Sequence, residues 1–125
     1  QVVLISGDGA FLSGGLSIET AFQENLPITV VIDNNGGLDC ISQQQERLFA
    51  NGKHFATDFR DIPFHTMFDG LGGHGEVVNT REELGPAMDR AMASGKPVCV
   101  NVKCRGVISP IVAATSDKRD KASIE

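Results

Sequence analysis

A carboxylate stands between two glycines at Gly7, Asp8 and Gly9, directly after the first apolar segment of the chain. Glycine lets a backbone turn sharply and approach a ligand closely, so a turn of this composition can accommodate a phosphate group. The carboxylate of Asp8 would repel a phosphate unless a cation lay between them. Mg²⁺ suits that position because it prefers oxygen ligands, including the phosphates of a bound substrate. The turn therefore predicts a metal ion together with a phosphate.

Further oxygen ligands follow the second apolar segment, where residues 33–37 read Asp-Asn-Asn-Gly-Gly. Asn35 comes 27 positions after Asp8 (35 − 8), a separation that fits one strand-helix-strand unit. The carboxyl ends of neighbouring parallel strands meet at one edge of a sheet, where ligands bind. The two turns are therefore expected to converge on one ion.

Other interpretations of these turns remain open. Asp, Asn and Gly favour turns for purely conformational reasons, so Asp8 and Asn35 could be ordinary turn residues. A dinucleotide-binding turn would need the pattern G-x-G-x-x-G, but Leu12 occupies the position of the third glycine, and the lysine of a Walker motif is missing.

The remaining polar candidates are expected to be structural. The three histidines do not have the spacing of metal ligands, and the one in the middle loop, His54, is the strongest candidate among them. Cys40 lies close to the Asn pair and could be a nucleophile, but no partner base for it can be identified. The tract at 43–45 could touch substrate or could be a solvated helix start. These candidates are Glu19, Cys40, Gln43, Gln44, Gln45, His54, His65 and His74.

The elements predicted to position the two turns are a strand at 2–6, a helix at 13–25 and a strand at 28–32. The first strand is a short apolar run and is expected to be buried on both faces. Pro27 ends the helix. Together these segments predict a parallel unit with a right-handed crossover.

The second half of the chain continues the alternation of helices and strands. Residues 34–61 have no clean period and are predicted to be a long loop that lines a site, with a helical start near Ser42. A short helix is expected at 63–71 and a brief strand at 76–78. Thr80 and Glu83 form a capping box for a helix that reaches Ser94, and residues 98–102 are predicted to be a strand.

Strands that alternate with helices predict an α/β fold, with a parallel sheet covered by helices on both faces. Residues 1–104 are expected to form one domain, and residues 105–125 a tail that lies across the surface. The net charge of −5, from 11 Lys and Arg against 16 Asp and Glu, leaves no basic stripe for nucleic acid. The apolar runs are too short to cross a membrane. Three cysteines without a CxxC pair favour a reducing cytoplasm.

These linked positions closely resemble the bipartite thiamine diphosphate motif, in which a GDG triplet is followed, after a crossover, by NN. The resemblance implies that the side chains of Asp8 and Asn35 and the carbonyl of Gly37 bind Mg²⁺. It implies a fold of the thiamine diphosphate-binding type, truncated on its N-terminal side. The cofactor-binding residues that it implies are Gly7, Asp8, Gly9, Ala10, Asn35, Gly37 and Leu38.

The segments at 64–75, 80–94 and 96–102 resemble the closing part of acetolactate synthase-like enzymes. That resemblance implies an enzyme that cleaves or forms C–C bonds next to a carbonyl, acting on a 2-oxo acid or 2-hydroxyacyl substrate. A 2-hydroxyacyl-CoA lyase or a 2-oxo acid decarboxylase is the alternative. The catalytic glutamate is expected from a pyrimidine-binding domain of the same or another subunit, in a homodimer or tetramer. No catalytic residue is therefore expected in this chain.

Two departures from the motif bear on the substrate. Ala10 stands where many relatives have Ser, and residues 36–39 lack the aromatic residue that often follows NN. Ala10 keeps its backbone amide, but the missing aromatic leaves the substrate subgroup open. Hypotheses of other classes are an isolated, non-catalytic cofactor-binding fragment and a dinucleotide-binding oxidoreductase domain.

Overall fold

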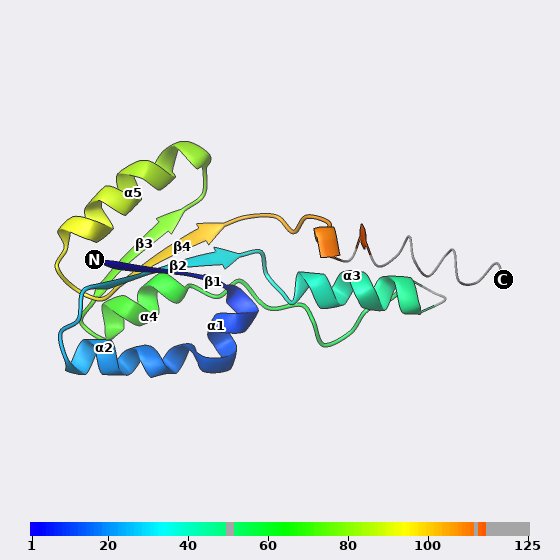
Figure 1. Cartoon of the computed structure of the whole chain (residues 1–125), viewed down its shortest axis with the longest axis horizontal. Coiled ribbons are helices and arrows are strands. Elements are labelled where there is room, and N and C mark those ends of the chain that lie inside the picture. The colour runs from blue at the N-terminus through cyan, green and yellow to red at the C-terminus, as the bar shows by residue number, and fades with distance from the viewer. Residues whose placement is uncertain (50–51, 112, 115–125) are drawn as a thin grey trace.

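The computed structural model describes residues 1–49, 52–111, 113 and 114 (Figure 1). Its four strands are parallel and follow the order β1-β2-β4-β3. They are β1 (Val2–Gly7), β2 (Ile28–Asn34), β3 (His74–Val78) and β4 (Val98–Lys103). The helical segments are α1 (Asp8–Gly14), the 3-10 helix η1 (Gly15–Ile18), α2 (Glu19–Gln23), α3 (Asp39–Leu48), α4 (Phe64–Gly70) and α5 (Arg81–Ala93). The predicted parallel α/β sheet is confirmed.

Helices cover both faces of this sheet, as predicted (Figure 1). Successive side chains of a strand point to opposite faces, and β4 divides its residues between two apolar clusters in this way. The cluster on the side of α1 and α4 comprises Phe11, Val30, Ile32, Phe64, Phe68 and Cys99. The cluster on the side of α5 comprises Val78, Ala87, Ala91, Val98 and Val100.

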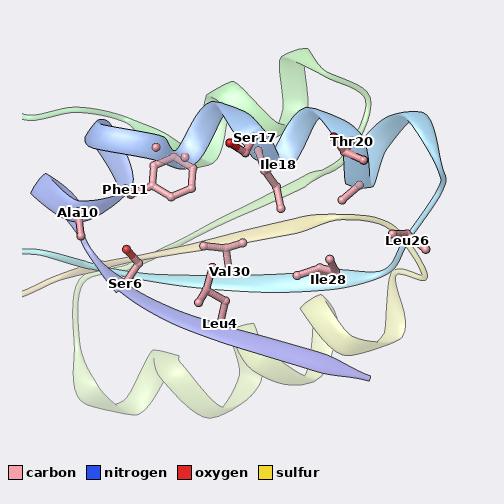
Figure 2. A pocket seen from close by; sticks show the side chains of 13 residues that line it. Leu4, Ser6, Ala10, Phe11, Ser17, Ile18, Thr20, Leu26, Ile28 and Val30 are labelled. Carbon is pink, nitrogen blue, oxygen red and sulfur yellow. The ribbon is translucent and has the colours of Figure 1, made fainter.

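The first strand differs from the prediction, because β1 is an exposed edge and is not buried on both faces. Val2, Val3, Leu4 and Ile5 keep 60%, 43%, 48% and 75% of their surface exposed. Beside them, an apolar groove of about 400 Å³ lies between β1, β2 and the helical segments α1 and α2 (Figure 2). The apolar run correctly indicated a strand, but no element among the described residues covers its outer edge.

The predicted helix at 13–25 is also different, since it begins earlier and is interrupted. Helix α1 starts at Asp8, within the glycine turn itself, and gives way to the 3-10 turn η1 at Gly15 before α2 begins. Glycine destabilises a helix interior, and the pair Gly14 and Gly15 lies at the break. The Asp8 turn is therefore the first turn of a helix.

The segment at 34–61 contains more structure than predicted. Helix α3 spans ten residues, Asp39–Leu48, and starts just after the asparagine turn. Beyond β4, the side-chain amide of Gln43 on α3 donates to the Val107 carbonyl at 2.8 Å and accepts from the Ser109 amide at 3.0 Å. The described part of the tail therefore lies against α3, and the charged residues predicted at 117–121 fall outside the described residues.

Helix α5 has the capping box predicted from Thr80 and Glu83. The Glu83 carboxylate accepts from the backbone amides of Asn79 and Thr80 at 2.7 and 3.2 Å. None of the helices in the described ranges is both long and apolar enough to span a membrane.

The last turn of α5 is joined to β3 by an ion pair that predicts acid sensitivity. Arg90 donates two hydrogen bonds to Glu76, at 2.9 and 2.8 Å. These bonds, with a smaller contribution from a hydrogen bond between Glu76 and His74, outweigh the effect of burial and lower the pKa of Glu76 from 4.5 to about 2. A carboxylate whose pKa is lower in the folded state stabilises the fold above its unfolded pKa, and that stabilisation is lost as the pH falls.

Arg90→Met is therefore expected to lower the free energy of unfolding at neutral pH, and its deficit relative to wild type should close as the pH falls from 4.5 towards about 2. Urea denaturation at a series of pH values measures this difference. Arg81→Met removes the same charge from the opposite end of α5 and serves as the control. A deficit for Arg90→Met that is constant over this range would contradict the assignment.

Candidate cofactor site

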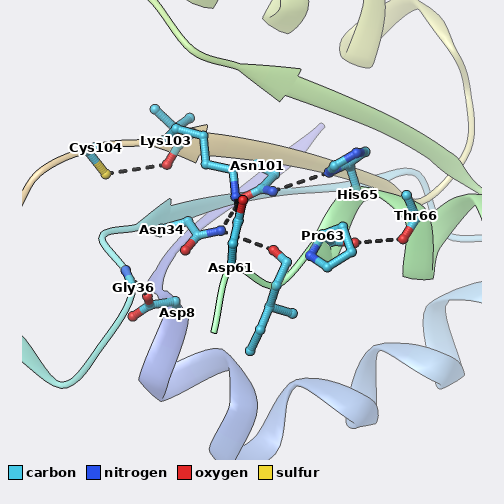
Figure 3. Close-up of polar contacts among 12 residues, drawn as sticks. Asp8, Asn34, Gly36, Asp61, Pro63, His65, Thr66, Asn101, Lys103 and Cys104 are labelled. Atoms are coloured by element: carbon cyan, nitrogen blue, oxygen red, sulfur yellow. Dashed lines mark hydrogen bonds and ion pairs between the residues drawn. The ribbon is translucent and has the colours of Figure 1, made fainter. Parts of the chain in front are cut away.

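The two glycine-rich turns meet at the carboxyl edge of the sheet, as predicted. Asp8 is only 2% exposed, and its Oδ2 accepts hydrogen bonds from the amides of Gly36 and Gly37 at 2.8 and 3.1 Å. Its Oδ1 accepts from the amide of Gly9 at 2.7 Å. Figure 3 shows the Asp8 side chain beside the backbone of Gly36. A buried carboxylate thus joins the start of α1 to the turn after β2.

The side chain of Asn35 reaches the same place. Its Oδ1 accepts from the amide of Gly37 at 3.2 Å, and this amide also donates to Asp8 Oδ2. The carboxylate oxygen and the amide oxygen therefore lie around a single N–H group. Two side-chain oxygens from neighbouring strand ends converge here, as the spacing of Asp8 and Asn35 predicted.

A second segment holds the turn after β2 in place. The Leu38 amide donates to the Thr57 carbonyl, and the Phe59 amide donates to the Gly36 carbonyl, each at 2.8 Å. Gly37 lies opposite Asp58 in an antiparallel bridge, and a Cβ at Gly37 would stand 2.6 Å from the Thr57 carbonyl oxygen. Glycine is required at this position because the two backbones approach so closely.

The sequence carries no local signal for this supporting segment. Thr57 is 2% exposed, and its hydroxyl oxygen accepts from Ser42 of α3 at 2.7 Å. No motif or period marks residues 57–59, and the bonds that they make to the turn use backbone atoms, which every residue type provides. Only the length of the loop hinted at a role in the site.

The first turn of α1 brings together other predicted cofactor residues. The first amides of a helix have no acceptor within the helix, and that of Gly9 donates to Asp8 Oδ1, so the amide of Ala10 is the one that suits an anion. Leu38 packs over this turn, because a Cβ at Gly9 would lie 2.3 Å from Leu38 Cδ2. Since the Leu38 amide already donates to Thr57, a contact of Leu38 with the cofactor would be made by its side chain.

Asn34 points away from this turn and into the protein. Its Nδ2 donates to the carbonyl of Ile62 at 3.1 Å and to Oδ1 of Asn101 at 2.9 Å, and the residue is 5% exposed. The two asparagines therefore have different environments, since Asn34 is anchored in the core and Asn35 faces the turn.

Cys99, near the start of β4, and Cys104, directly after its end, do not have the low pKa of a nucleophilic thiol. Burial raises the pKa of Cys99 to about 12. Burial and, to a smaller extent, a hydrogen bond to Asp33 raise the pKa of Cys104 to about 12. Both groups remain neutral thiols at physiological pH, and thiols are poor nucleophiles and poor metal ligands.

Several of the other polar candidates make contacts of their own, among them Cys40 with Gln44. His54 contacts Glu46 at 2.8 Å and Asp58 at 3.1 Å, and its pKa is raised chiefly by the hydrogen bond to Asp58. His74 contacts Glu76 at 2.7 Å. Within the described ranges, no three His, Cys, Asp or Glu side chains gather closely enough to hold a metal ion.

The donors around Asp8 nevertheless fit Mg²⁺. They include one carboxylate and one side-chain amide oxygen, which are hard oxygen ligands of the kind that Mg²⁺ prefers. Mg²⁺ is commonly bound through one or two carboxylates together with substrate phosphates, so a protein site with a single carboxylate suits a metal that a phosphate group shares.

Comparison with known proteins decides the family. The family model described as "Thiamine pyrophosphate enzyme, C-terminal TPP binding domain" matches residues 1–102. The chain belongs to this family. Thiamine pyrophosphate and thiamine diphosphate are the same cofactor, so the resemblance found in the sequence is confirmed.

Individual relatives of this TPP-binding domain agree with the family. A probable acetolactate synthase of Mycobacterium bovis is 40% identical over 103 residues, which cover 82% of this chain and 18% of that protein. The oxalyl-CoA decarboxylase of Escherichia coli K12 is 36% identical over 116 residues, which cover 92% of this chain and 20% of that protein. The domain thus spans about a fifth of the length of these relatives.

A solved structure confirms the fold. The thiamine diphosphate-dependent 4-hydroxybenzoylformate decarboxylase of Rhodococcus jostii RHA1 superimposes with a TM-score of 0.77 at 28% identity, over 87% of this chain and 20% of that one. The match places the sheet and its helices in the fold of thiamine diphosphate enzymes.

Proposed function

We propose that this TPP-binding domain anchors the diphosphate of thiamine diphosphate through Mg²⁺. Asp8 and Asn35 would bind the metal through their side chains, and Gly37 through its carbonyl oxygen. The observation that carries the proposal is the convergence of Asp8 Oδ2 and Asn35 Oδ1 on the amide of Gly37, at 3.1 and 3.2 Å. The backbone of Gly7, Gly9 and Ala10 would contact the diphosphate.

The burial of Asp8 supports a cation at this position. An acidic group beside a diphosphate is repulsive unless positive charge lies between them, and a site that is 2% exposed provides little screening by water. The hydrogen bonds from Gly36 and Gly37 fix the carboxylate, so its orientation is set before any ligand binds. A preformed ligand of this kind loses little entropy when the metal arrives.

The chemistry of the bound cofactor would be the making and breaking of C–C bonds next to a carbonyl, with its thiazolium ring as the electron sink. The residues of this chain would bind and orient the diphosphate end. We infer that the glutamate which acts on the pyrimidine ring comes from a pyrimidine-binding domain of the same or another subunit, in a homodimer or tetramer.

An acetolactate synthase-like carboligase is the leading proposal for the whole enzyme, with a 2-oxo acid or 2-hydroxyacyl substrate. A 2-hydroxyacyl-CoA lyase or a decarboxylase is the alternative. The relatives favour this set, because their names include an acetolactate synthase, an oxalyl-CoA decarboxylase and a 2-hydroxyacyl-CoA lyase.

Isothermal titration calorimetry of the full-length natural protein with thiamine diphosphate tests the proposed cofactor site. Binding is expected in the presence of Mg²⁺ and should be lost when EDTA removes the metal, since the Asp8 carboxylate then repels the diphosphate. Metal-independent binding, or no binding with Mg²⁺ present, would count against the proposal. Pyruvate turnover by the 125-residue chain alone would contradict the inferred need for a partner domain.

A further inference from the structure

A chain of hydrogen bonds connects the end of β2 to helix α4 across the neighbouring strand β4. Asn34 ends β2, Asn101 lies on the neighbouring strand β4, and His65 is on α4 (Figure 3). Asn34 Nδ2 lies 2.9 Å from Asn101 Oδ1, and Asn101 Nδ2 lies 3.2 Å from His65 Nδ1. These three side chains form a polar relay at the edge of an otherwise apolar core.

The direction of each bond follows from one backbone carbonyl. The carbonyl of Ile62 can only accept, so the group of Asn34 that faces it at 3.1 Å must be the NH₂. The same NH₂ donates to Asn101, which must therefore present its oxygen to Asn34 and its own NH₂ to His65. An NH₂ can only donate, and Nδ1 of His65 must accept. The relay thus requires His65 to accept at Nδ1 and to carry a proton on Nε2.

Burying the polar side chain of Asn101 here costs free energy unless its amide makes hydrogen bonds. It is 0% exposed, and a buried amide is tolerated only when its hydrogen bonds are made. Cys99 lies two residues earlier on the same face of β4 and belongs to the apolar cluster beneath α4. An apolar side chain at position 101 would continue that cluster, whereas Asn101 instead links Asn34 to His65.

The relay acts on the residue next to a proposed metal ligand. The side chain of Asn34 is held by Ile62 and Asn101, and its carbonyl accepts from the Cys104 amide at 3.1 Å. Successive residues of a strand point to opposite faces. Fixing Asn34 towards the core therefore fixes the direction in which Asn35 leaves the strand and enters the turn.

We propose that Asn101 and His65 are positioning residues for the cofactor site, acting through Asn34 to hold the turn of Asn35 and Gly37 in its metal-binding geometry. This inference rests on the proposed function. The hydrogen bonds of these two residues lead to Asn34 and not to Asn35 or Gly37, so their effect should appear in the affinity for Mg²⁺ and thiamine diphosphate. Supporting partners of metal ligands typically change metal affinity by about 10–100-fold when they are removed.

Variants of His65 test the relay with little disturbance of the core, because this side chain is only partly buried. His65→Leu leaves the NH₂ of Asn101 without an acceptor and is expected to weaken Mg²⁺-dependent binding of thiamine diphosphate by about 10-fold. His65→Asn can return a side-chain oxygen near the position of Nδ1 and should restore most of that affinity. Rescue by an acceptor is not expected of a residue that only fills space.

Asn101→Leu breaks both bonds of the relay and is expected to weaken binding by up to about 100-fold. Cys99→Ala is the matched control, since it alters an equally buried side chain on the same face of β4 without touching Asn34. Cys99→Ala should lower the melting temperature and leave the affinity unchanged. Calorimetry on the full-length natural protein measures both variants at a temperature where they are folded.

The tautomer of His65 gives a readout that does not depend on the cofactor. Nitrogen-15 NMR of the histidine side chain is expected to show the proton on Nε2, and a proton on Nδ1 would overturn the relay. If the wild type binds and both Leu variants bind equally well, the inference fails alone. If the wild type does not bind thiamine diphosphate with Mg²⁺, the proposed function fails and the inference with it.

Discussion

Asp8→Asn is expected to weaken Mg²⁺-dependent binding of thiamine diphosphate by about 100-fold or more, the largest effect of any single substitution at this site. The substitution removes the only carboxylate among the proposed metal ligands, and even supporting partners of a ligand typically contribute about 10–100-fold to metal affinity. It also replaces one oxygen by an NH₂, which cannot accept from the amides that now donate to both carboxylate oxygens. Calorimetric titration with cofactor at saturating Mg²⁺ measures the loss.

Asp33→Asn provides the control for Asp8→Asn. Asp33 lies at the same edge of the sheet but is exposed, and its carboxylate contacts the Cys104 thiol. The same change of charge there should leave cofactor affinity within about twofold, since exposed charges contribute little. Equal losses in the two variants would indicate a general electrostatic effect, and unchanged binding by Asp8→Asn would remove Asp8 from the metal site.

The convergence of Asp8 and Asn35 could be predicted because it depends on local and topological rules. Residue types that favour turns follow two apolar segments, and the spacing between them fits one parallel crossover, so their meeting point follows from the fold class. Helix α5 was predictable for a similar reason, because a capping box is defined by four consecutive residues, here 80–83. Signals of this kind need no knowledge of distant contacts.

The supports of the site depend on distant partners and could not be predicted. Asn101 is visible in the sequence as a polar residue in an apolar strand, but its partners His65 and Asn34 are 36 and 67 positions away. The apolar run of β1 likewise indicates that its side chains should be buried, but the surface that would bury them cannot be identified from the sequence. Periodicity reports which side chains avoid water, and tertiary packing alone determines what they contact.

The backbone contact between the asparagine turn and residues 57–59 explains why the turn keeps its shape, and Gly37→Ala is expected to disrupt it. A Cβ at position 37 would lie 2.6 Å from the Thr57 carbonyl oxygen. That atom belongs to the backbone, so relief requires the two segments to separate. Overpacking of this kind typically costs about 1–3 kcal/mol. Separation would also withdraw the Gly37 amide from Asp8 and Asn35, so cofactor affinity should fall together with stability.

Gly70→Ala is the matched control for Gly37→Ala, because it adds the same methyl group in open space. Gly70 is the last residue of helix α4 and precedes Leu71, and no atom beyond its chain neighbours and its own helix backbone lies within 4 Å of a Cβ there. Alanine is favoured over glycine in a helix, so the melting temperature should not fall. Thermal denaturation with and without Mg²⁺ and thiamine diphosphate compares the two variants. The cofactor should raise the melting temperature of Gly70→Ala as much as that of the wild type, and that of Gly37→Ala by much less. A Gly37→Ala protein that matches the wild type in both measurements would show that the contact with Thr57 does not hold the cofactor turn.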